Sequence, residues 1–572
     1  MHGKLLSQNI KKSFYGLDCA TQFIDWLLQY KTLLHHNKHN QSESINYIRV
    51  YGFNSSNFDN KFIYTLLHER DNNAEMVMNN GSIKRMIYNN ISFYDLNLLY
   101  ASGSLNTVCE SLGLGQKIDF DITTVNMENY NDINIKNDVI KYCSIDAELT
   151  YKLALDYIEN SVGKINGINY DVSDCITAGS VAKKIFQQVF QKDILVASPS
   201  DVLVAEKQAF FGGRNSIFKR EFKSTNPQAV MYDIDLNSSY GKAMTLNQPY
   251  KFLRNVEQHQ IFNITNSREI INTRLYYISS YKYLGTDSNI INNIVERNDK
   301  GEMVTYKKYD VPSVHWGIEL KECALNNFEI ITYKYSEYIE KPIFKEFSEY
   351  FYNERLTYKD AGNISKAKFY KNISTNFFGK FSQKTYAISK IVNSFDDIFK
   401  YIGDDMSLLV NYTNMNNGLG LLEYKSPQHD DINGLIRFSS YIAAVGRVQL
   451  SRCMRNIGFN HIYYCATDSI FTDKMPDAEF LSERELGKFK VENVIKQASF
   501  ISAGVYTVKT FDNDVIKKSK AIKAELLSEE DFVNLSEGKS INKTHTKFIK
   551  NVNGCKIVNM SHTLKPTFRQ II

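Results

Sequence analysis

The sequence predicts a multidomain α/β protein, and three observations carry that prediction. The chain has 572 residues, too many for one hydrophobic core, so we expect roughly three to five domains or subdomains. In the first 175 residues, segments with helical spacing of apolar residues alternate with short β-like runs, as they do in α/β domains. Beyond Gly212-Gly213 a second region begins, in which β-like runs and helical segments again occur together.

Apolar spacing justifies the elements expected in the first region. Phe23, Trp26 and Leu27 recur at the spacing of one helix face. In chain order, we expect a helix within residues 14–30, a strand at 45–51, a helix from about residue 60, a buried strand at 93–96, and helices at 104–114 and 138–158. These elements form one α/β module that ends near residue 175.

The second region contains both strand and helix signals. In chain order, we expect a strand at 230–234 that feeds a loop with Asp235, short strands and loops over 245–345, a charged helical hairpin over 341–370, turns rich in Asn, Asp and Gly over 385–435, and a helix over 437–457. The hairpin is broken at Gly362-Asn363. A basic cluster of Lys517, Lys518, Lys520 and Lys523 opens a mixed C-terminal unit; it could line a DNA channel, although such a run is more often a solvated face.

Composition is that of an ordinary globular protein, with 43% hydrophobic and 23% charged residues. The net charge of +5 neither demands nor excludes nucleic acid. Eight cysteines are scattered without a C-x-x-C pair, which favours reduced, packed thiols. We see no secretory signal and no run of about 18 apolar residues. We therefore expect a cytoplasmic protein with no membrane partner.

Two aspartates stand where apolar runs meet short turns, and a lysine-led helix lies between them in the sequence. The segment Tyr464–Ile470 reads as a hairpin with Asp468 at its tip, and Tyr232–Tyr240 contains Asp235. The segment Lys371–Lys380 is the lysine-led helix. Phosphoryl transfer needs two divalent cations about 3.5–4 Å apart, and hard cations prefer carboxylate oxygens. A lone Asp would more often simply open a turn.

In that order, the three segments resemble motifs A, B and C of family B DNA polymerases, written DxxSLYP, KxxxNSxYG and DTDS. At this chain length they are most similar to the protein-primed branch of tailed phages and linear plasmids. The resemblance implies an RNase H-like 3′–5′ exonuclease domain followed by a right-hand polymerase domain with two insertions. The implied bounds are 1–175 for the exonuclease-like domain and, within 176–572, 205–245 and 430–516 for the palm, 246–340 for insertion one, 341–384 for the fingers, 385–429 for insertion two and 517–572 for the thumb.

The resemblance implies that Asp235 and Asp468 are the catalytic metal ligands, holding two Mg²⁺ ions for which Mn²⁺ can substitute. Ala466 is an important departure, because the family has an Asp two residues before the metal-binding one. A methyl group cannot coordinate a cation. Since the second Asp carries the direct contact in the family, we expect weakened rather than abolished synthesis.

The resemblance also implies a nucleotide-binding set. Tyr240 takes the place of the residue that stacks under the incoming sugar and excludes a 2′-hydroxyl. Lys371 takes the place of the triphosphate-binding lysine, and Phe378 that of the aromatic residue beside the new base pair. Lys371, Thr375 and Phe378 fall on one helix face. Arg355 resembles a second cation for the triphosphate, with a surface salt bridge as the alternative.

Four segments resemble the family's DNA-binding elements. Phe210-Phe211-Gly212-Gly213 is similar to the YxGG linker, and Ala443–Arg447 is similar to the template-binding Tx2(G/A)R motif, with Arg447 as its arginine. Val505-Tyr506 stands where the family has KxY, although Gly504 replaces the lysine. Ser104-Leu105 resembles the (S/T)Lxxh element that binds single strands.

The exonuclease resemblance is incomplete. Asn54, Phe58 and Asp59 match the second exonuclease motif, and Tyr142 and Asp146 match the third, YxxxD. The first motif, DxE on an early strand, does not occur before Asp59. We therefore expect weak or absent proofreading, with a start upstream of Met1 as an equal explanation for the missing motif. Asp18, the first acidic residue, is expected to cap a helix rather than to replace it.

The resemblance implies a DNA-templated DNA polymerase that adds dNMP to a terminal-protein hydroxyl or to a DNA 3′-hydroxyl. Its partners would be template and primer DNA, dNTPs and a terminal protein, with the chain a monomer or a heterodimer with that protein, in the host cytoplasm if viral. One alternative is a nuclease with an accessory right-hand domain. Another is a catalytically impaired homologue that binds DNA or a partner protein, which Ala466 and Gly504 favour.

Overall fold

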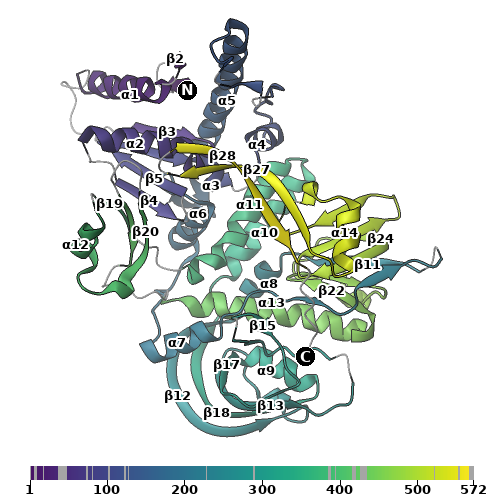
Figure 1. Cartoon of the computed structure of the whole chain (residues 1–572). Coiled ribbons are helices and arrows are strands. Elements are labelled where there is room, and N and C mark those ends of the chain that lie inside the picture. The colour runs from purple at the N-terminus through teal and green to yellow at the C-terminus, as the bar shows by residue number, and fades with distance from the viewer. Residues whose placement is uncertain are drawn as a thin grey trace.

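The structure is a computed structural model in which several modules surround one long buried helix, α13 (Ile436–Ile457) (Figure 1). It describes residues 2–5, 10–16, 18–36, 48–71, 75–79, 82–100, 103–121, 124–126, 128–226, 229–287, 290–299, 301–383, 388–392, 394–414, 420–425, 434–520, 522, 524–551 and 554–565. Helix α13 separates a strongly curved sheet from the helices and the second sheet on its other side. The predicted multidomain α/β class is confirmed.

The N-terminal module is built on a sheet with the order β3-β6-β5-β4. Strands β3 (Ile48–Gly52) and β6 (Ile91–Asp95) run parallel, and β5 (Ser82–Tyr88) and β4 (Glu75–Asn79) complete the sheet in antiparallel pairs. The predicted buried strand near residue 93 is confirmed as β6, in which every residue is buried. Of the strand predicted at 45–51, residues 45–47 lie outside the described residues.

Helices surround this sheet. Their bounds are α1 (Cys19–His36), α2 (Asp59–Asp71), α3 (Leu96–Tyr100), α4 (Leu105–Ser111) and α5 (Ile133–Asn160). Helices α1, α2, α4 and α5 lie where the sequence predicts them, whereas α3 was not predicted and begins at residue 96, the last residue of the strand predicted at 93–96. A small hairpin of β1 (His2–Leu5) and β2 (Ile10–Ser13) precedes them, and β7 (Val162–Ile165) pairs with β8 (Ile168–Asp171) after α5. Asp18 lies directly before α1, where its carboxylate accepts a hydrogen bond from Gln22 Nε2 at 2.8 Å.

The second large sheet combines strands from distant parts of the chain. Its order is β26-β25-β24-β11-β23-β22-β9, and β10 pairs with β24 at one side. The bounds are β9 (Asn215–Ile217), β10 (Glu221–Lys223), β11 (Met231–Leu236), β22 (Ile462–Ala466), β23 (Ser469–Thr472), β24 (Phe489–Ser502), β25 (Val505–Thr510) and β26 (Val515–Lys518). The strand predicted at 230–234 is confirmed but runs two residues further, so Asp235 lies within β11 and not in a loop.

The curved sheet follows directly in the sequence. Strands β12 (Gln248–Phe262) and β18 (Phe328–Lys341) are long and pair along most of their length. The pairing register shifts at three places between them, which bends both strands and interrupts the alternation that a flat strand would show. Strands β13 (Leu275–Tyr283), β16 (Lys308–Tyr309) and β17 (Ser313–Trp316) complete the sheet, β14 (Glu296–Arg297) pairs with β15 (Met303–Val304), and α9 (Gly317–Leu325) follows β17. Here the prediction of short strands is confirmed for β14–β17 but wrong for β12, β13 and β18.

The predicted helical hairpin is confirmed as α10 (Lys345–Asp360) and α11 (Ile364–Gly379). Gly362 at the break has a φ of +73°, a conformation that favours glycine. Asn363 then caps α11, since its side chain accepts a hydrogen bond from the Lys366 amide at 3.0 Å. Helix α11 continues beyond the predicted end at residue 370.

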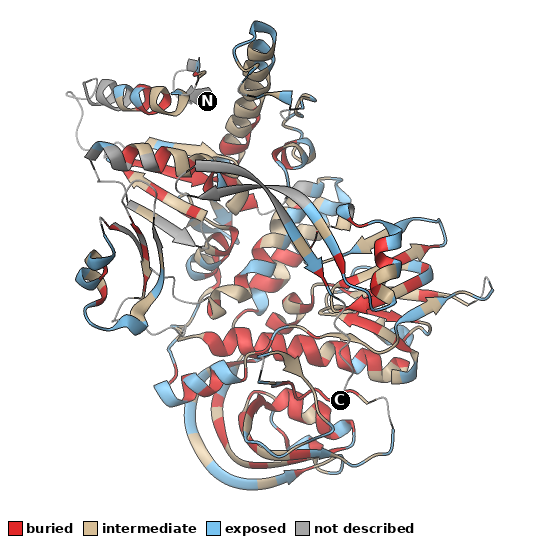
Figure 2. Cartoon of the chain, in the orientation of Figure 1, coloured by how far each residue is buried: buried red, intermediate tan, exposed pale blue. Residues whose placement is uncertain are grey.

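An aromatic cluster joins this hairpin to the segment that follows the N-terminal module and to α13. Phe186, at the junction of α6 (Ala178–Ile185) and a short π-helix, η3 (Phe186–Phe190), packs its ring against Phe344, Phe347 and Phe377 at centroid distances of 5.0–5.9 Å. Phe344 in turn contacts Phe438 of α13 at 5.1 Å. The continuous buried zone in the centre of the molecule includes these rings (Figure 2). The hairpin is therefore fixed at its base.

Smaller elements complete the chain. They are α7 (Ser200–Gln208), α8 (Ser239–Thr245), β19 (Ile388–Val392), α12 (Phe399–Ile402), β20 (Leu409–Asn414), β21 (Gly420–Tyr424), α14 (Glu529–Ser536), β27 (Ile541–Asn551) and β28 (Gly554–Leu564). Of the predicted basic cluster, Lys517 and Lys518 lie at the end of β26 and Lys520 follows it, whereas Lys523 lies outside the described residues. Every helix in the described part of the chain is too short or too polar to span a membrane.

Ion pairs hold α9 against α13, and the pair of Arg447 with Glu319 is buried on both sides. Arg447 is 2% exposed, and its guanidinium donates to Glu319 Oε1 through Nε at 3.0 Å and NH2 at 2.7 Å. Glu322, also buried, pairs with Arg452 at 3.1 Å and Arg455 at 2.6 Å. Two charges removed from water are stable only while each keeps its partner. The curved sheet is therefore attached to α13 through charges that cannot be lost singly.

We expect Arg447→Ala to lower the free energy of unfolding by about 3–5 kcal/mol, because Glu319 would remain buried without its partner. The double variant Arg447→Met with Glu319→Leu removes both charges and should recover part of that loss, because the carbonyl groups of Phe211 and Gly212 still lose the donor that Arg447 provides. Urea titration monitored by fluorescence measures both, since Trp316 donates to Ser440 of α13 at 2.8 Å and reports on this contact.

Arg254→Ala is the control, since the Arg254 side chain is 70% exposed in its pair with Glu337 and its loss should cost less than about 1 kcal/mol. Equal losses for Arg447→Ala and the double variant would contradict a buried, coupled pair.

Candidate active site

Antiparallel pairing brings the two predicted aspartates to the same end of the second sheet. Asp235 of β11 pairs with Ser469, the residue after Asp468. The Leu236 amide donates to the Asp468 carbonyl at 2.8 Å, which extends the pairing into the turn. Thr467 adopts a φ of +56°, so the hairpin turn between β22 and β23 is tight. Two carboxylates that lie 233 positions apart in sequence are therefore neighbours in space.

The two carboxylates repel one another in a partly buried setting. Burial raises the pKa of Asp235 to about 7, and the negative charges of Asp468 and Glu492 contribute in the same direction. Burial also raises the pKa of Asp468, while the positive charge of Lys371 opposes that rise. Burial raises the pKa of Asp233, on the same strand, to about 6, against a hydrogen bond from Asn493. Such a cluster favours a bound cation.

Divalent cations fit these residues. Among the described residues, no group of three or more His, Cys, Asp or Glu side chains forms a ready cation cage. Asp235 and Asp468 instead offer oxygen ligands on adjacent strand ends, and Mg²⁺ commonly keeps several waters and shares substrate phosphates. Burial raises both pKa values, and for Asp235 the charge of Asp468 adds to that rise; a bound cation would offset this cost of holding charge.

Ala466 leaves one wall of this site without a carboxylate. It ends β22, where it pairs with Ser469 and with Asn215 of β9. Glu492 supplies a different acidic group: it occupies the bulge where β24 shifts register opposite Asp233. Sequence reasoning missed Glu492, because an exposed Glu on a long strand carries no motif. The ion pair between Glu492 and Lys490 could not be predicted from the sequence either.

Helix α11 places the predicted nucleotide-binding residues beside the aspartates. The rings of Tyr240 and Phe378 lie 4.1 Å apart between centroids. Lys371 is exposed, and its charge acts on Asp468. Gly446 of α13 lies behind the tyrosine, since a Cβ there would lie 3.3 Å from Tyr240 Cε1. Arg355 lies on α10, with its guanidinium 6.0 Å from the Tyr352 ring centroid.

The glycine linker contacts the turn that carries Asp468. A Cβ on Gly213 would lie 2.6 Å from Thr467 Cγ2, so only glycine allows this approach. The Thr467 amide donates to the Arg214 carbonyl at 2.6 Å. Arg447 NH1 donates to the carbonyl oxygens of Phe211 and Gly212 at 2.6 and 2.9 Å. The linker is thus held by the Thr467 turn on one side and by Arg447 of α13 on the other.

The structure does not place Arg447 where the prediction of a DNA-binding residue requires it. Its guanidinium is buried and is bonded to Glu319 and to the linker carbonyls, so it presents no donor to a template. The helix buries this side chain because position 447 faces α9 rather than solvent. Sequence reasoning could not distinguish these two directions on a helix that is buried along most of its length.

Tyr506 lies in an aromatic group beneath the same sheet. Its ring contacts Phe471 at 5.4 Å and Tyr464 at 5.5 Å, and burial together with the charge of Asp233 raises its pKa. Gly504, two residues earlier, has a φ of +78°, and the aliphatic chain of Lys520 covers it. Lys520 was predicted only as part of a basic cluster. Nothing in the sequence indicated that its side chain lies against Gly504.

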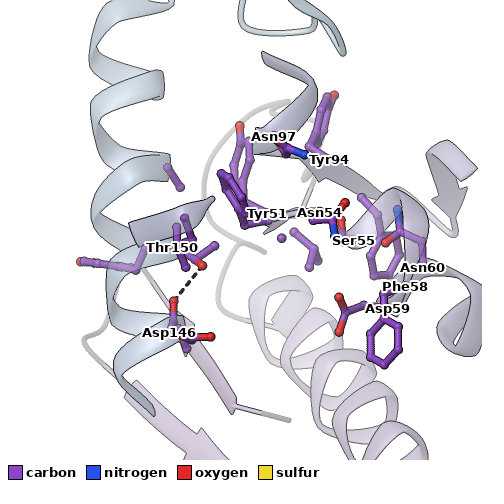
Figure 3. A pocket seen from close by; sticks show the side chains of 18 of the residues that line it. Tyr51, Asn54, Ser55, Phe58, Asp59, Asn60, Tyr94, Asn97, Asp146 and Thr150 are labelled. Carbon is purple, nitrogen blue, oxygen red and sulfur yellow. Dashed lines mark hydrogen bonds between the residues drawn. The ribbon is translucent and has the colours of Figure 1, made fainter. Parts of the chain in front are cut away.

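Four of the five exonuclease-like residues, all but Tyr142, line a pocket of about 740 Å³ in the N-terminal module. Figure 3 shows Asp59, at the start of α2, and Asp146, on α5, on opposite walls of this pocket. Lys117 Nζ donates to Asp146 Oδ2 at 2.6 Å and to the Tyr142 hydroxyl at 3.1 Å. Asp146 Oδ1 is buried and lacks a hydrogen-bond partner among the described residues. An ammonium group therefore neutralises one of the two carboxylates.

The remaining predicted residues of this module differ in their surroundings: some line the pocket and others do not. Asn54 and Phe58 line the pocket, and the Asn54 amide donates to Asp95 Oδ1 at 2.7 Å. Ser104 caps α4, since its hydroxyl accepts from the Thr107 amide at 3.2 Å. Leu105 is 5% exposed and packs in the core, so it offers little surface to a DNA strand. Asp18 does not line the pocket.

Comparison with solved structures shows the fold. A Phi29 DNA polymerase complexed with primer-template DNA and incoming nucleotide substrates superimposes with a TM-score of 0.66 at 15% sequence identity, covering 91% of each chain. The orthorhombic crystal form of Phi29 DNA polymerase gives a TM-score of 0.65 over 98% of this chain and 95% of that chain, also at 15% identity. The chain therefore has an exonuclease-like domain followed by a right-hand polymerase domain.

Two curated relatives are described as probable DNA polymerases. That of Agaricus bitorquis is 24% identical over 72% of this chain and 53% of its own length, and that of Neurospora intermedia is 24% identical over 68% and 39%. The chain thus spans about half or less of the length of these relatives. The family model for DNA polymerase type B, organellar and viral, matches residues 116–406, which are 291 of the 572 residues. The chain belongs to this family of type B DNA polymerases.

Proposed function

We propose that the chain is a DNA-templated DNA polymerase of the protein-primed type. It would add dNMP to a terminal-protein hydroxyl or to a DNA 3′-hydroxyl. The single observation that carries this proposal is the joint placement of Asp235 and Asp468 at paired strand ends beside the exposed Lys371. Carboxylates that repel one another and a nearby ammonium group form a site for two divalent cations and a triphosphate.

The residues of the chain have distinct roles in this reaction. Asp235 and Asp468 would hold two Mg²⁺ ions, which when bound activate the attacking hydroxyl and neutralise the leaving pyrophosphate. Lys371 reaches the triphosphate from α11 and orients it toward the hydroxyl. Tyr240, backed by Gly446, closes the space beside the sugar, and Phe378 packs over the new base pair. Arg355 adds a second positive charge from α10.

The long curved sheet of β12, β13 and β18 supports the protein-primed type, because it occupies the stretch where the resemblance implies the first insertion. The small sheet of β19, β20 and β21 occupies the stretch of the second. A priming protein would be the partner of these insertions, and the enzyme a monomer or a heterodimer with it. Template and primer would contact the linker at Gly212-Gly213 and the surface near Tyr506.

A second candidate is a catalytically impaired homologue that binds DNA or a partner protein. Ala466 favours it, because the site has lost a carboxylate that the family uses. Glu492 weakens it, since its negative charge acts on Asp235 at the same site. Primer extension with Mg²⁺ and dNTPs distinguishes the two candidates directly.

Asp235→Asn and Asp468→Asn should each remove most primer extension, at least about a hundredfold, because each removes a charged ligand from a two-cation site. DNA binding should survive, since phosphate contacts come from basic side chains elsewhere. Asp473→Asn is the matched control, because Asp473 follows the same hairpin but pairs with His461. Near-parental extension by either site variant would refute the ligand assignment.

Tyr240→Ala should let ribonucleotides compete with deoxyribonucleotides, because the exclusion of a 2′-hydroxyl by an aromatic ring is steric. The ratio of kcat/KM for dNTP and rNTP in primer extension measures this change. Tyr463→Ala, on β22 and hydrogen-bonded to Asp473, should leave the ratio unchanged. An unaltered ratio in Tyr240→Ala would mean that the ring only fills the core.

We expect little or no 3′–5′ exonuclease activity from the chain. Asp59 and Asp146 lie on opposite walls of the pocket, and Lys117 already neutralises Asp146. One weakly held cation cannot stabilise both the attacking and the leaving oxygen. The measurement is shortening of a 5′-labelled single-stranded oligonucleotide with Mg²⁺ or Mn²⁺. Stepwise 3′ shortening that Asp146→Ala abolishes would disprove this expectation.

A further inference from the structure

The N-terminal module contacts the helix that carries the proposed nucleotide-binding residues. Asn372, on α11, donates from Nδ2 to the carbonyl oxygen of Tyr100 at 2.8 Å, across 272 positions of sequence. Tyr100 is the last residue of α3, where carbonyl groups have no partner within the helix. The Asn372 amide satisfies one of these groups. This bond joins the exonuclease-like domain to the fingers one residue after Lys371.

Tyr100 is itself held in place from α5. Its hydroxyl donates to Asp156 Oδ2 at 2.6 Å, and its ring lies 5.8 Å from that of Phe369 on α11. It is 6% exposed, and burial raises its pKa, so the neutral phenol is the donor. The carbonyl that receives the Asn372 bond is therefore part of a fixed residue. If Asn372 is replaced, the Tyr100 carbonyl cannot move to find another donor, because Tyr100 is held by Asp156.

A second contact fixes the other end of α11. The aliphatic chain of Lys380 lies against Gly179 of α6, where a Cβ would come within 2.8 Å of Lys380 Cε. Burial and the nearby Lys183 lower the pKa of Lys380, and its Nζ donates to Gln383 at 2.8 Å. Ser439 of α13 donates to the Phe378 carbonyl at the same end. The segment that presents Lys371 and Phe378 therefore lies between two fixed points.

We propose that the exonuclease-like domain positions the nucleotide-binding helix, and that Asn372 is the positioning residue. The proposal rests on the polymerase function proposed above. It gives the domain a task that needs no metal and no nuclease chemistry. Asn372 belongs to neither the metal ligands nor the nucleotide-contacting set, and acts on the triphosphate site only through the placement of Lys371.

The test uses the full chain and two readouts. Asn372→Ala removes the donor, and Asn372→Asp replaces it with oxygens that repel the Tyr100 carbonyl. We expect KM for dNTP to rise about threefold to tenfold in the alanine variant, as the loss of one net hydrogen bond allows, and more in the aspartate variant, with smaller changes in kcat. Amide hydrogen exchange over residues 364–379 should quicken in the same order. Asn353→Ala, an exposed Asn on α10, is the matched control.

The outcomes separate the possible failures. Alanine is the best helix former, so a role limited to helix propensity would slow exchange in Asn372→Ala instead of quickening it. If KM and exchange in both Asn372 variants match the control, the positioning role is overturned. If the unaltered chain extends no primer, the polymerase proposal fails, but hydrogen exchange still decides whether Asn372 holds α11 to the N-terminal module.

Discussion

The pairing of β11 with β23 is the constraint on which the rest of the structure depends. It forces two carboxylates into one partly buried space, at an electrostatic cost that the sheet must sustain whenever no cation is bound. Several features around it serve to keep that arrangement rigid. The linker glycine Gly213 lies against the turn at Thr467, and Gly446 of α13 lies behind Tyr240. Two carboxylates held close together are kept in place only if the surrounding residues pack tightly, and the contacts of Gly213 and Gly446 provide such packing.

The modules are fixed to one another by two different kinds of interaction. Aromatic rings from α6, the fingers and α13 form an apolar junction that tolerates small shifts of packing. The buried ion pair of Arg447 with Glu319, between α13 and α9, is more demanding, since each charge depends on its partner. The curved sheet is thus attached to α13 through charged side chains, whereas the hairpin of α10 and α11 is attached through packed aromatic rings.

Sequence reasoning predicted residues that the structure brings together at the candidate site, but it did not predict what surrounds them. Asp235, Asp468 and the helix of Lys371 could be predicted because a motif states which residue type stands at which spacing. Arg447 could not, since the motif gives no direction for a side chain on a buried helix. Glu492 and the placement of Lys520 over Gly504 depend on a bulge and a turn that have no sequence signature. The long curved strands were missed for a related reason: their bulges break the alternation that identifies a strand.

The sheet that carries the aspartates is assembled from segments far apart in the chain, and this affects how the protein is made. Strand β11 pairs with β24, whose residues are synthesised some 260 positions later. Until then, one edge of β11 lacks its partner, while the curved sheet and the hairpin of α10 and α11 already have their own local contacts. These units can fold first during translation, and the central sheet closes last. A ribosome that stalls before β24 would therefore leave two folded modules joined by an open, aggregation-prone strand.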